Sequence, residues 1–178
     1  MKKLVSIMLL IFSLACSAQI DLFNNCPKIT WHETVDNMRE IFPYSSPCAQ
    51  DSFKNGFYTA LNIENVTFCG VALKGRAVFS KKSHTLARLV FEPKDAGDSP
   101  ENANMIFGYF RGLLFAKLGA PKILEPYQKK IVYGGKYEWK RDNVFISVDL
   151  FSGDNYSRVS LMLDSQDWET LCSEIQRD

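Results

Sequence analysis

The sequence has little of what enzymes and metalloproteins usually depend on. Its 178 residues include only two histidines, and no two cysteines form a CxxC pair. There is no GxSxG nucleophile turn, no phosphate-binding loop and no dinucleotide-binding glycine pattern. Acidic residues are scattered singly, so no pair of carboxylates stands out for acid–base catalysis. These absences count against metal-dependent or nucleophilic catalysis, and the sequence predicts no cofactor.

The sequence also lacks a charge imbalance. Its 21 basic and 20 acidic residues give a net charge of +1. A balance this close to neutral gives no general attraction to nucleic acid or to anionic lipid. There is no low-complexity stretch that would form a disordered tail. Beyond the N-terminal segment there is no long apolar run, so no transmembrane helix is predicted in the mature chain.

The first 18 residues are typical of an export signal. Lys2 and Lys3 precede the apolar run "LVSIMLLIFSLA", which is shorter than the roughly 20 residues that span a bilayer. Small residues then precede a cleavage site after Ala18, which would leave residues 19–178 as a single domain. The sequence therefore predicts an exported protein, either periplasmic or secreted.

A lipoprotein signal is the alternative interpretation of this segment. Cys16 would then become an acylated N-terminus that attaches the protein to a membrane. A lipoprotein signal usually has leucine three residues before the cysteine, whereas Ser13 stands there in this chain. A lipid anchor at Cys16 therefore stays open beside the unanchored form.

Four cysteines remain whichever signal is used, and an even number in an exported chain predicts two disulfides. They are Cys26, Cys48, Cys69 and Cys172. Cys26 and Cys48 flank the first predicted helix, so a bridge between them would close a compact loop and stabilise the fold by about 3 kcal/mol. Cys69 and Cys172 would then pair by elimination. One alternative is that Cys69 and Cys172 are simply buried thiols. A second is that the four cysteines bind zinc, which is less favoured because the chain has no CxxC pair.

The first half of the mature chain reads as a helix followed by strands. Thr30 and Glu33 have the spacing of a capping box, and Pro43 ends the helix, which predicts a helix over 30–42. One apolar stripe runs along it through Trp31, Val35, Met38 and Phe42. A two-residue period then covers 57–80, with a hairpin-like turn predicted at Lys74–Gly75, and 85–93 is a further strand.

A second helix is predicted from Ser99, the N-cap, to a stop at Gly119. Pro100 fits its first position, and apolar residues occur on most of its sides, so we expect it to be largely buried. Within it, "GYFRG" at 108–112 has small residues four positions apart. In a soluble chain this spacing predicts a close approach of the helix to the sheet.

The pattern then repeats with three strands and a closing helix. The strands are "GGKYEWKRD", "NVFISVDLF" and "SRVSLMLD". The closing helix covers 165–176, with Trp168, Leu171, Cys172 and Ile175 on one stripe. Residues 28–93 and 99–164 therefore form two similar units of one helix and antiparallel strands. The predicted fold is α+β, a mostly antiparallel sheet with helices on one face.

These elements resemble a group of small exported bacterial proteins found in Bacteroidetes. The resemblance lies in "VTFCGVALKGRAVFS", "LARLVFEP", the helix ending "FAKLGAPK" and the following "YEW" strand. Leu118 stands where that group has an aromatic residue. The resemblance implies a similar fold and no particular activity. The tandem helix-and-sheet units are also similar in fold to the beta-lactamase inhibitor protein, which implies nothing about function.

Two segments offer weak metal-binding patterns. "HETVD" at 32–36 has Asp36 where a zinc-protease helix needs a second histidine, so a solvated helix face is the favoured interpretation for His32. "DAGDSPEN" gathers Asp95, Asp98 and Glu101, without the alternating ligands of a calcium loop. These acids are better explained as favouring the N-terminus of the second helix.

Residues 127–143 are the best candidate for a contact surface, because aromatic and basic residues alternate there. Such residues stack on sugars or form protein hot spots. The candidate partner-binding residues are Tyr133, Lys136, Tyr137, Trp139 and Lys140. The alternative is a strand with Tyr137 and Trp139 pointing into the core and the lysines pointing out.

The sequence therefore predicts an exported cell-envelope protein that binds a protein or a glycan and is not an enzyme. Two alternatives stay open. One is a hydrolase acting on envelope or host polymers, and the other is an envelope assembly factor held by a lipid on Cys16.

Overall fold

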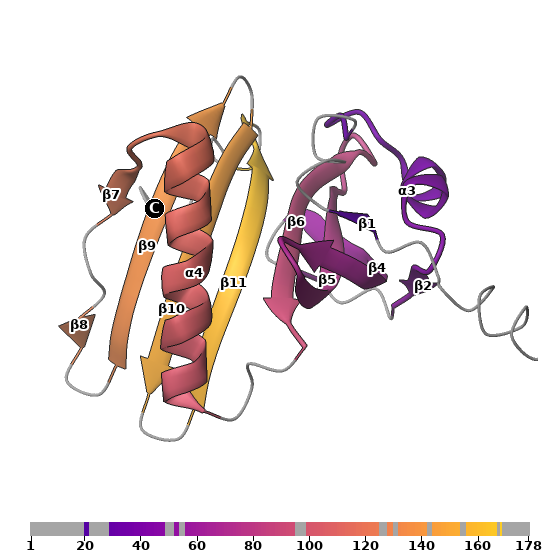
Figure 1. Cartoon of the computed structure of the whole chain (residues 1–178). Helices are drawn as coiled ribbons and strands as arrows, with labels where there is room; N and C mark the ends of the chain where they lie inside the picture. Colours follow the sequence, from indigo (N-terminus) through magenta and orange to yellow (C-terminus); the bar gives the residue numbers. More distant parts are fainter. Residues whose placement is uncertain are drawn as a thin grey trace, which may run out of the picture.

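The computed structural model describes residues 20–21, 29–48, 52–53, 56–94, 99–124, 128–129, 132–141, 144–153, 156–166 and 168. Figure 1 shows the arrangement of the elements. The helices whose bounds lie in these described ranges are α3 (Val35–Ile41) and α4 (Pro100–Leu118). The strands are β1 (Ile20–Asp21), β2 (Ser46–Pro47), β3 (Ser52–Phe53), β4 (Phe57–Phe68), β5 (Val71–Ser80), β6 (Leu86–Pro93), β7 (Lys122–Leu124), β8 (Gln128–Lys129), β9 (Val132–Arg141), β10 (Val144–Gly153) and β11 (Tyr156–Ser165).

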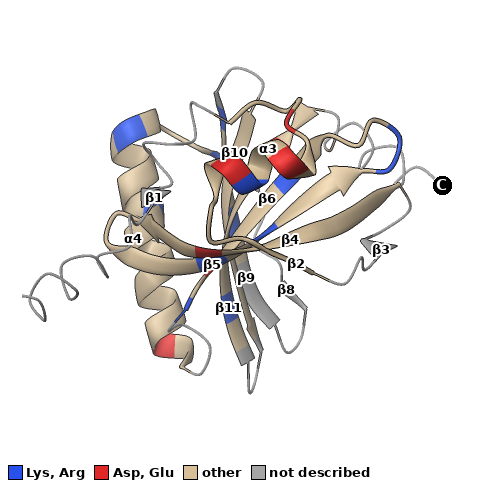
Figure 2. Cartoon of the chain, turned by 90° about the vertical axis from the view of Figure 1, so that its right-hand side faces the viewer, with Lys and Arg blue, Asp and Glu red and all other residues tan. Residues whose placement is uncertain are grey.

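The strands form a single sheet in the order β1-β4-β5-β6-β11-β10-β9-β7, with β2 and β3 also on β4 and β8 on β9. Every pairing is antiparallel except that of β1 with β4. β6 and β11 join the two halves, with Arg88 opposite Asp164. Strands β4 and β5 run across the direction of β9–β11, so the sheet is strongly twisted (Figures 1 and 2). The predicted mixed α+β fold with a mostly antiparallel sheet is confirmed.

Helix α4 begins and ends where its capping residues predict. The Ser99 hydroxyl accepts a hydrogen bond from the Asn102 amide at 3.3 Å, and Pro100 is the first helical residue. Gly119 ends the helix with a φ of +83°, a conformation that favours glycine. The helix packs on β10 and β11 (Figure 1) and buries Ala103, Phe107, Phe110 and Leu114.

The prediction that this helix is largely buried is wrong. Met105, Tyr109 and Phe115 are 67%, 47% and 55% exposed. A Cβ atom built on Gly108 or Gly112 would have no heavy atom within 4 Å, so these glycines do not bring the helix close to the sheet either. The physical reason is that one sheet covers only one side of a helix, which leaves apolar residues on the other sides in contact with solvent.

The first helix begins later than predicted. Thr34 is the N-cap of α3, and its hydroxyl accepts a hydrogen bond from the Asn37 amide at 3.3 Å. Thr30 and Glu33 do not form the predicted capping box. The Thr30 hydroxyl donates to the Glu33 carboxylate at 3.0 Å, and the Asn37 side chain donates to the same carboxylate at 2.9 Å. The Glu33 carboxylate thus accepts hydrogen bonds from Thr30, before the helix, and from Asn37, inside it.

The β4–β5 hairpin turns at Cys69–Gly70, so the predicted turn at Lys74–Gly75 is wrong. Cys69 and Gly70 have φ values of +49° and +86°, and positive values at both positions are what a two-residue hairpin loop needs. Gly75 lies inside β5. A Cβ atom there would lie 2.5 Å from the Phe91 ring, so this glycine serves close packing rather than a turn.

One continuous hydrophobic core joins the two helices to the sheet. Met38 and Phe42 of α3 are buried in it, as the predicted stripe requires, and the Phe42 ring lies 6.4 Å from that of Phe91. The Phe110 ring of α4 lies 5.1 Å from that of Phe68. A smaller separate cluster contains Phe57, Val78, Ala87 and Trp168.

Several predictions concern residues outside the described ranges. They include the export signal at 1–18 and, apart from its first residues and Trp168, the closing helix at 165–176. Cys26 and Cys172 also lie outside, so each predicted disulfide has one cysteine whose position is not described, and both bridges stay predictions. Neither of the described helices is long and apolar enough to cross a membrane.

Candidate functional site

Strand β9 carries the predicted contact residues, and its two aromatic residues face α4. Trp139 is 3% exposed, and its indole N–H donates to the Gly119 carbonyl at 2.8 Å. The Tyr137 ring lies 5.8 Å from that of Phe107, and the Arg111 guanidinium donates to the Tyr137 hydroxyl at 3.2 Å. This placement corresponds to the alternative in which the aromatic residues belong to the core.

The two lysines of this stretch lie on the opposite side of β9. The Lys136 ammonium is 3.5 Å from the Glu138 carboxylate, and the Lys140 ammonium lies 5.1 Å from the centre of the Phe145 ring. The side chain of Tyr133 is outside the described part of the chain. The described members of the predicted set are therefore divided between two faces of the sheet and do not form one surface.

The side of the sheet opposite α4 is rich in charged groups, and we name it the charged face. Side chains alternate along a strand, so its residues are the neighbours of the core residues. For example, Leu161 and Leu163 are in the core, whereas Ser160 and Asp164 point the other way. Figure 2 marks the charged residues along the strands. The charged face comprises Asn62, Lys74, Arg76, Arg88, Glu92, Lys136, Glu138, Lys140, Asp149, Arg158, Ser160 and Asp164.

Glu92 lies between two arginines at the centre of the charged face. Its Oε1 is 3.6 Å from the Arg76 guanidinium and 3.5 Å from that of Arg158. Among the described residues this buried oxygen has no hydrogen-bond donor in good geometry, so charge attraction holds the three groups together. Arg158 also donates to the Ser160 hydroxyl at 3.1 Å. The side chains of Arg76 and Arg158 stay 47% and 44% exposed, so both can bind an acceptor from solution.

Arg88 and Asp164 form a second pair that is almost entirely buried. The guanidinium donates two parallel hydrogen bonds of 2.5 Å to the two carboxylate oxygens. The side chains of Arg88 and Asp164 are 14% and 1% exposed. Arg88 also lies 4.0 Å from the centre of the Trp168 ring. This pair links β6 to β11.

Asp149 lies on β10, at the side of the same network. Burial raises the pKa of its carboxyl group above the usual value, and the charges of Lys136, Arg158 and Arg88 oppose the rise. The folded protein therefore binds a proton here at a higher pH than the unfolded chain does. The cost of burying this charge is present near neutral pH and is removed as the pH falls through the raised pKa.

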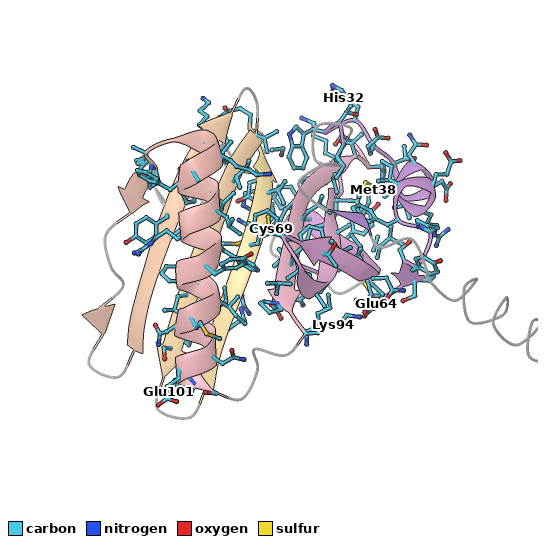
Figure 3. All side chains as sticks on the ribbon, in the orientation of Figure 1. His32, Met38, Glu64, Cys69, Lys94 and Glu101 are labelled. Carbon is cyan, nitrogen blue, oxygen red and sulfur yellow. The ribbon has the colours of Figure 1, made fainter. Side chains whose placement is uncertain are left out.

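An open pocket of about 410 Å³ lies over β4, β5 and β6 on the charged face. Its lining residues are Ser46, Asn62, Glu64, Lys74, Gly75, Arg76, Val90 and Glu92. At its rim, Lys94 and Glu64 form an ion pair of 2.8 Å (Figure 3). Charges of both signs line the pocket, so it suits a polar group that offers both hydrogen-bond donors and acceptors.

The weak metal-binding patterns do not gather ligands in the described part of the chain. No group of three or more His, Cys, Asp or Glu side chains lies together there. His32 is exposed and projects away from the molecule (Figure 3), and Asp36 pairs with Arg39 at 3.3 Å. Glu101 is exposed in the first turn of α4. Asp95 and Asp98 lie outside the described residues.

Sequence reasoning missed the charged face, because its members come from distant strands. The signal that could have found it is the alternation of Lys74 and Arg76 on β5 and of Arg158 and Ser160 on β11 with apolar neighbours. No protein family model matches the chain, and no curated protein or solved structure is significantly similar to it. The functional conclusion therefore rests on the geometry of the chain's own residues.

Proposed function

We propose that this protein is an exported, non-enzymatic binding module of the cell envelope and that a partner protein docks on the charged face. The observation that carries the proposal is the arrangement of Arg76 and Arg158 around Glu92. Two half-exposed guanidinium groups are held in place on a rigid sheet by one carboxylate. Groups oriented before binding lose little entropy on association, which favours recognition of carboxylates or backbone carbonyls on a partner.

A protein partner fits this surface better than a glycan does. Charges of both signs stand side by side on the charged face, and such a pattern complements a folded protein surface. A glycan site usually offers exposed aromatic rings for stacking. The candidates from the sequence, Tyr137 and Trp139, face α4 instead.

The tandem arrangement that the sequence pattern predicts is also part of the proposal. In it α3 with β4–β6 is one unit, α4 with β9–β11 is the other, and both helices lie on one side of the sheet. Two observations support it. The strand order β4-β5-β6-β11-β10-β9 is symmetric about its centre. Both helices contribute side chains to one core cluster. Such an arrangement leaves Arg76 and Arg158 of the charged face exposed, whereas Trp168 packs over Arg88.

Attachment to a membrane through Cys16 is the second form of the proposal. In β1, Ile20 pairs with Val66 of β4, near one edge of the sheet. Cys16 precedes Ile20 by four residues, which span at most about 14 Å when extended. A lipid on Cys16 would therefore hold the β4 edge close to the membrane surface, as an envelope assembly factor requires.

Replacing both exposed arginines tests the proposal. We expect Arg76→Gln/Arg158→Gln to raise the Kd for a partner captured from the envelope at least about tenfold, which corresponds to about 1.4 kcal/mol. The variant should be less stable than the wild type, because the Glu92 carboxylate, whose side chain is 22% exposed, loses both of its counter-charges. The Kd is measured by titrating the captured partner into the purified variant, and a thermal melt confirms folding.

The matched control is Lys81→Gln/Lys82→Gln, which removes two exposed positive charges from the turn between β5 and β6. This control should bind the captured partner as well as the wild type does. Equal binding by the double arginine variant would exclude the charged face as the docking surface.

A further inference from the structure

The side of α4 that faces away from the sheet is unusually apolar. Three of its large side chains, Met105, Tyr109 and Phe115, are 47–67% exposed. Among the other side chains that the structure describes, the exposed large apolar ones are Tyr44 and Phe151, which are 43% and 41% exposed. Apolar side chains gathered on one surface are characteristic of an interaction site. We name this surface the outer α4 face, formed by Met105, Gly108, Tyr109, Gly112 and Phe115.

The two glycines on this face have no explanation within the described chain. A glycine inside a helix destabilises it relative to alanine. At Gly108 and Gly112 a Cβ atom would meet nothing within 4 Å, so no neighbour in the described structure requires a glycine at either position. Residues four apart lie on the same side of a helix. Their shared lack of a side chain would let a second helix come close to the backbone of α4.

The charges of α4 indicate that the second helix is α4 of another copy. Its one acidic residue, Glu101, stands in the first turn (Figure 3), and the basic residue Lys117 stands in the last turn. Two antiparallel copies place the acidic end of each helix beside the basic end of the other and oppose their dipoles. A parallel arrangement would place like charges together.

We propose that two copies of this chain form a symmetric dimer by packing their outer α4 faces together in an antiparallel arrangement. With the twofold axis midway between Gly108 and Gly112, Met105 of one helix lies level with Phe115 of the other. A thioether and an aromatic ring make a favourable contact. The same patch is used on both copies, as a twofold interface requires.

The edges of the outer α4 face are already held in place. The Tyr109 hydroxyl donates to the Cys69 carbonyl at 3.1 Å, and Arg111 is held by the Tyr137 hydroxyl at 3.2 Å. Because these contacts exist in the single chain, little ordering is needed when two copies meet. The interface lies on the opposite side of the sheet from the charged face, so the dimer does not depend on the proposed function.

Sedimentation of the purified mature protein over a range of concentrations tests the dimer. We expect the wild type to dimerise and Gly112→Gln to raise the dimer Kd at least about tenfold, because a side chain then occupies the contact. Glutamine is a better helix former than glycine, and the space around Gly112 is open, so the monomer should stay folded. Lys82→Gln is the control in an exposed turn and should leave the dimer Kd unchanged.

A charge exchange tests the antiparallel geometry. Glu101→Lys should weaken the dimer, and adding Lys117→Glu to it should restore the dimer, because opposite charges again face each other. A wild type that stays monomeric at millimolar concentration would overturn the proposal. A dimer that is insensitive to Gly112→Gln would also overturn it. The proposal would also be overturned if the protein stays monomeric and binds phosphatidylglycerol vesicles through the outer α4 face.

Discussion

Trp139→Ala should lower the free energy of unfolding by about 3–5 kcal/mol, the usual cost of truncating a large buried aromatic side chain. Trp139 is 3% exposed and lies in the main core. Its indole N–H also donates to the Gly119 carbonyl, so the residue ties β9 to the end of α4. Alanine removes both the packing and this hydrogen bond. Urea denaturation followed by circular dichroism measures the change.

Lys140→Ala, one residue further along β9, is the control. Lys140 is exposed on the other side of the strand. We therefore expect the free energy of unfolding of the Lys140→Ala protein to stay within about 0.5 kcal/mol of the wild-type value. A Trp139→Ala protein as stable as the wild type would place this indole on the surface. The aromatic and basic stretch would then again be a candidate binding surface.

Breaking the buried pair between β6 and β11 should have an effect of similar size. Arg88→Met leaves the Asp164 carboxylate buried without its counter-charge, and Asp164→Leu does the same to Arg88. Each single replacement should cost about 3–5 kcal/mol, because an unpaired charge in the interior is strongly unfavourable. The double replacement should recover most of that loss, since two apolar side chains fill the space without leaving a charge.

The four proteins of this double-mutant cycle are compared by urea denaturation at neutral pH. Arg88 also packs on Trp168, and methionine keeps part of that contact. A single replacement that costs less than about 1 kcal/mol would show that the pair is not buried from water as described. If the loss of unfolding free energy in the double variant equals the sum of the losses in the two single variants, Arg88 and Asp164 do not stabilise each other.

Local chemistry explains which parts of the fold were predictable. Ser99, Pro100 and Gly119 set the bounds of α4 because each acts within one turn of its own position. Gly75 was misread as a turn, because a glycine also permits close packing, here against Phe91, and only the folded sheet shows which role applies. The outward position of Gly108 and Gly112 was missed for the same reason.

The charged face was beyond sequence reasoning because it depends on strand register. Arg88 and Asp164 are 76 residues apart and meet only because β6 pairs with β11. Arg158 reaches Glu92 through the same pairing. The alternation along β9 did predict two opposite faces, yet the sequence alone did not decide which face was covered by a helix. The position of α4 on the sheet decides it.

The two proposed surfaces lie on opposite sides of the sheet. A dimer through the outer α4 face would leave both charged faces open, so each dimer would present two docking surfaces. Two surfaces on one particle raise the apparent affinity for a partner that is itself arrayed in the envelope. The dimer would thus raise the apparent affinity for such a partner without adding a contact to the charged face.

Lysine acylation compared between intact envelope and purified protein tests the central claim most directly. If a partner covers the charged face, Lys74, Lys136 and Lys140 should be acylated less in the envelope than in the purified protein. Lys81 and Lys82, exposed in the turn between β5 and β6, should be acylated equally in both. Equal acylation of all five lysines in both preparations would contradict a docking role for the charged face.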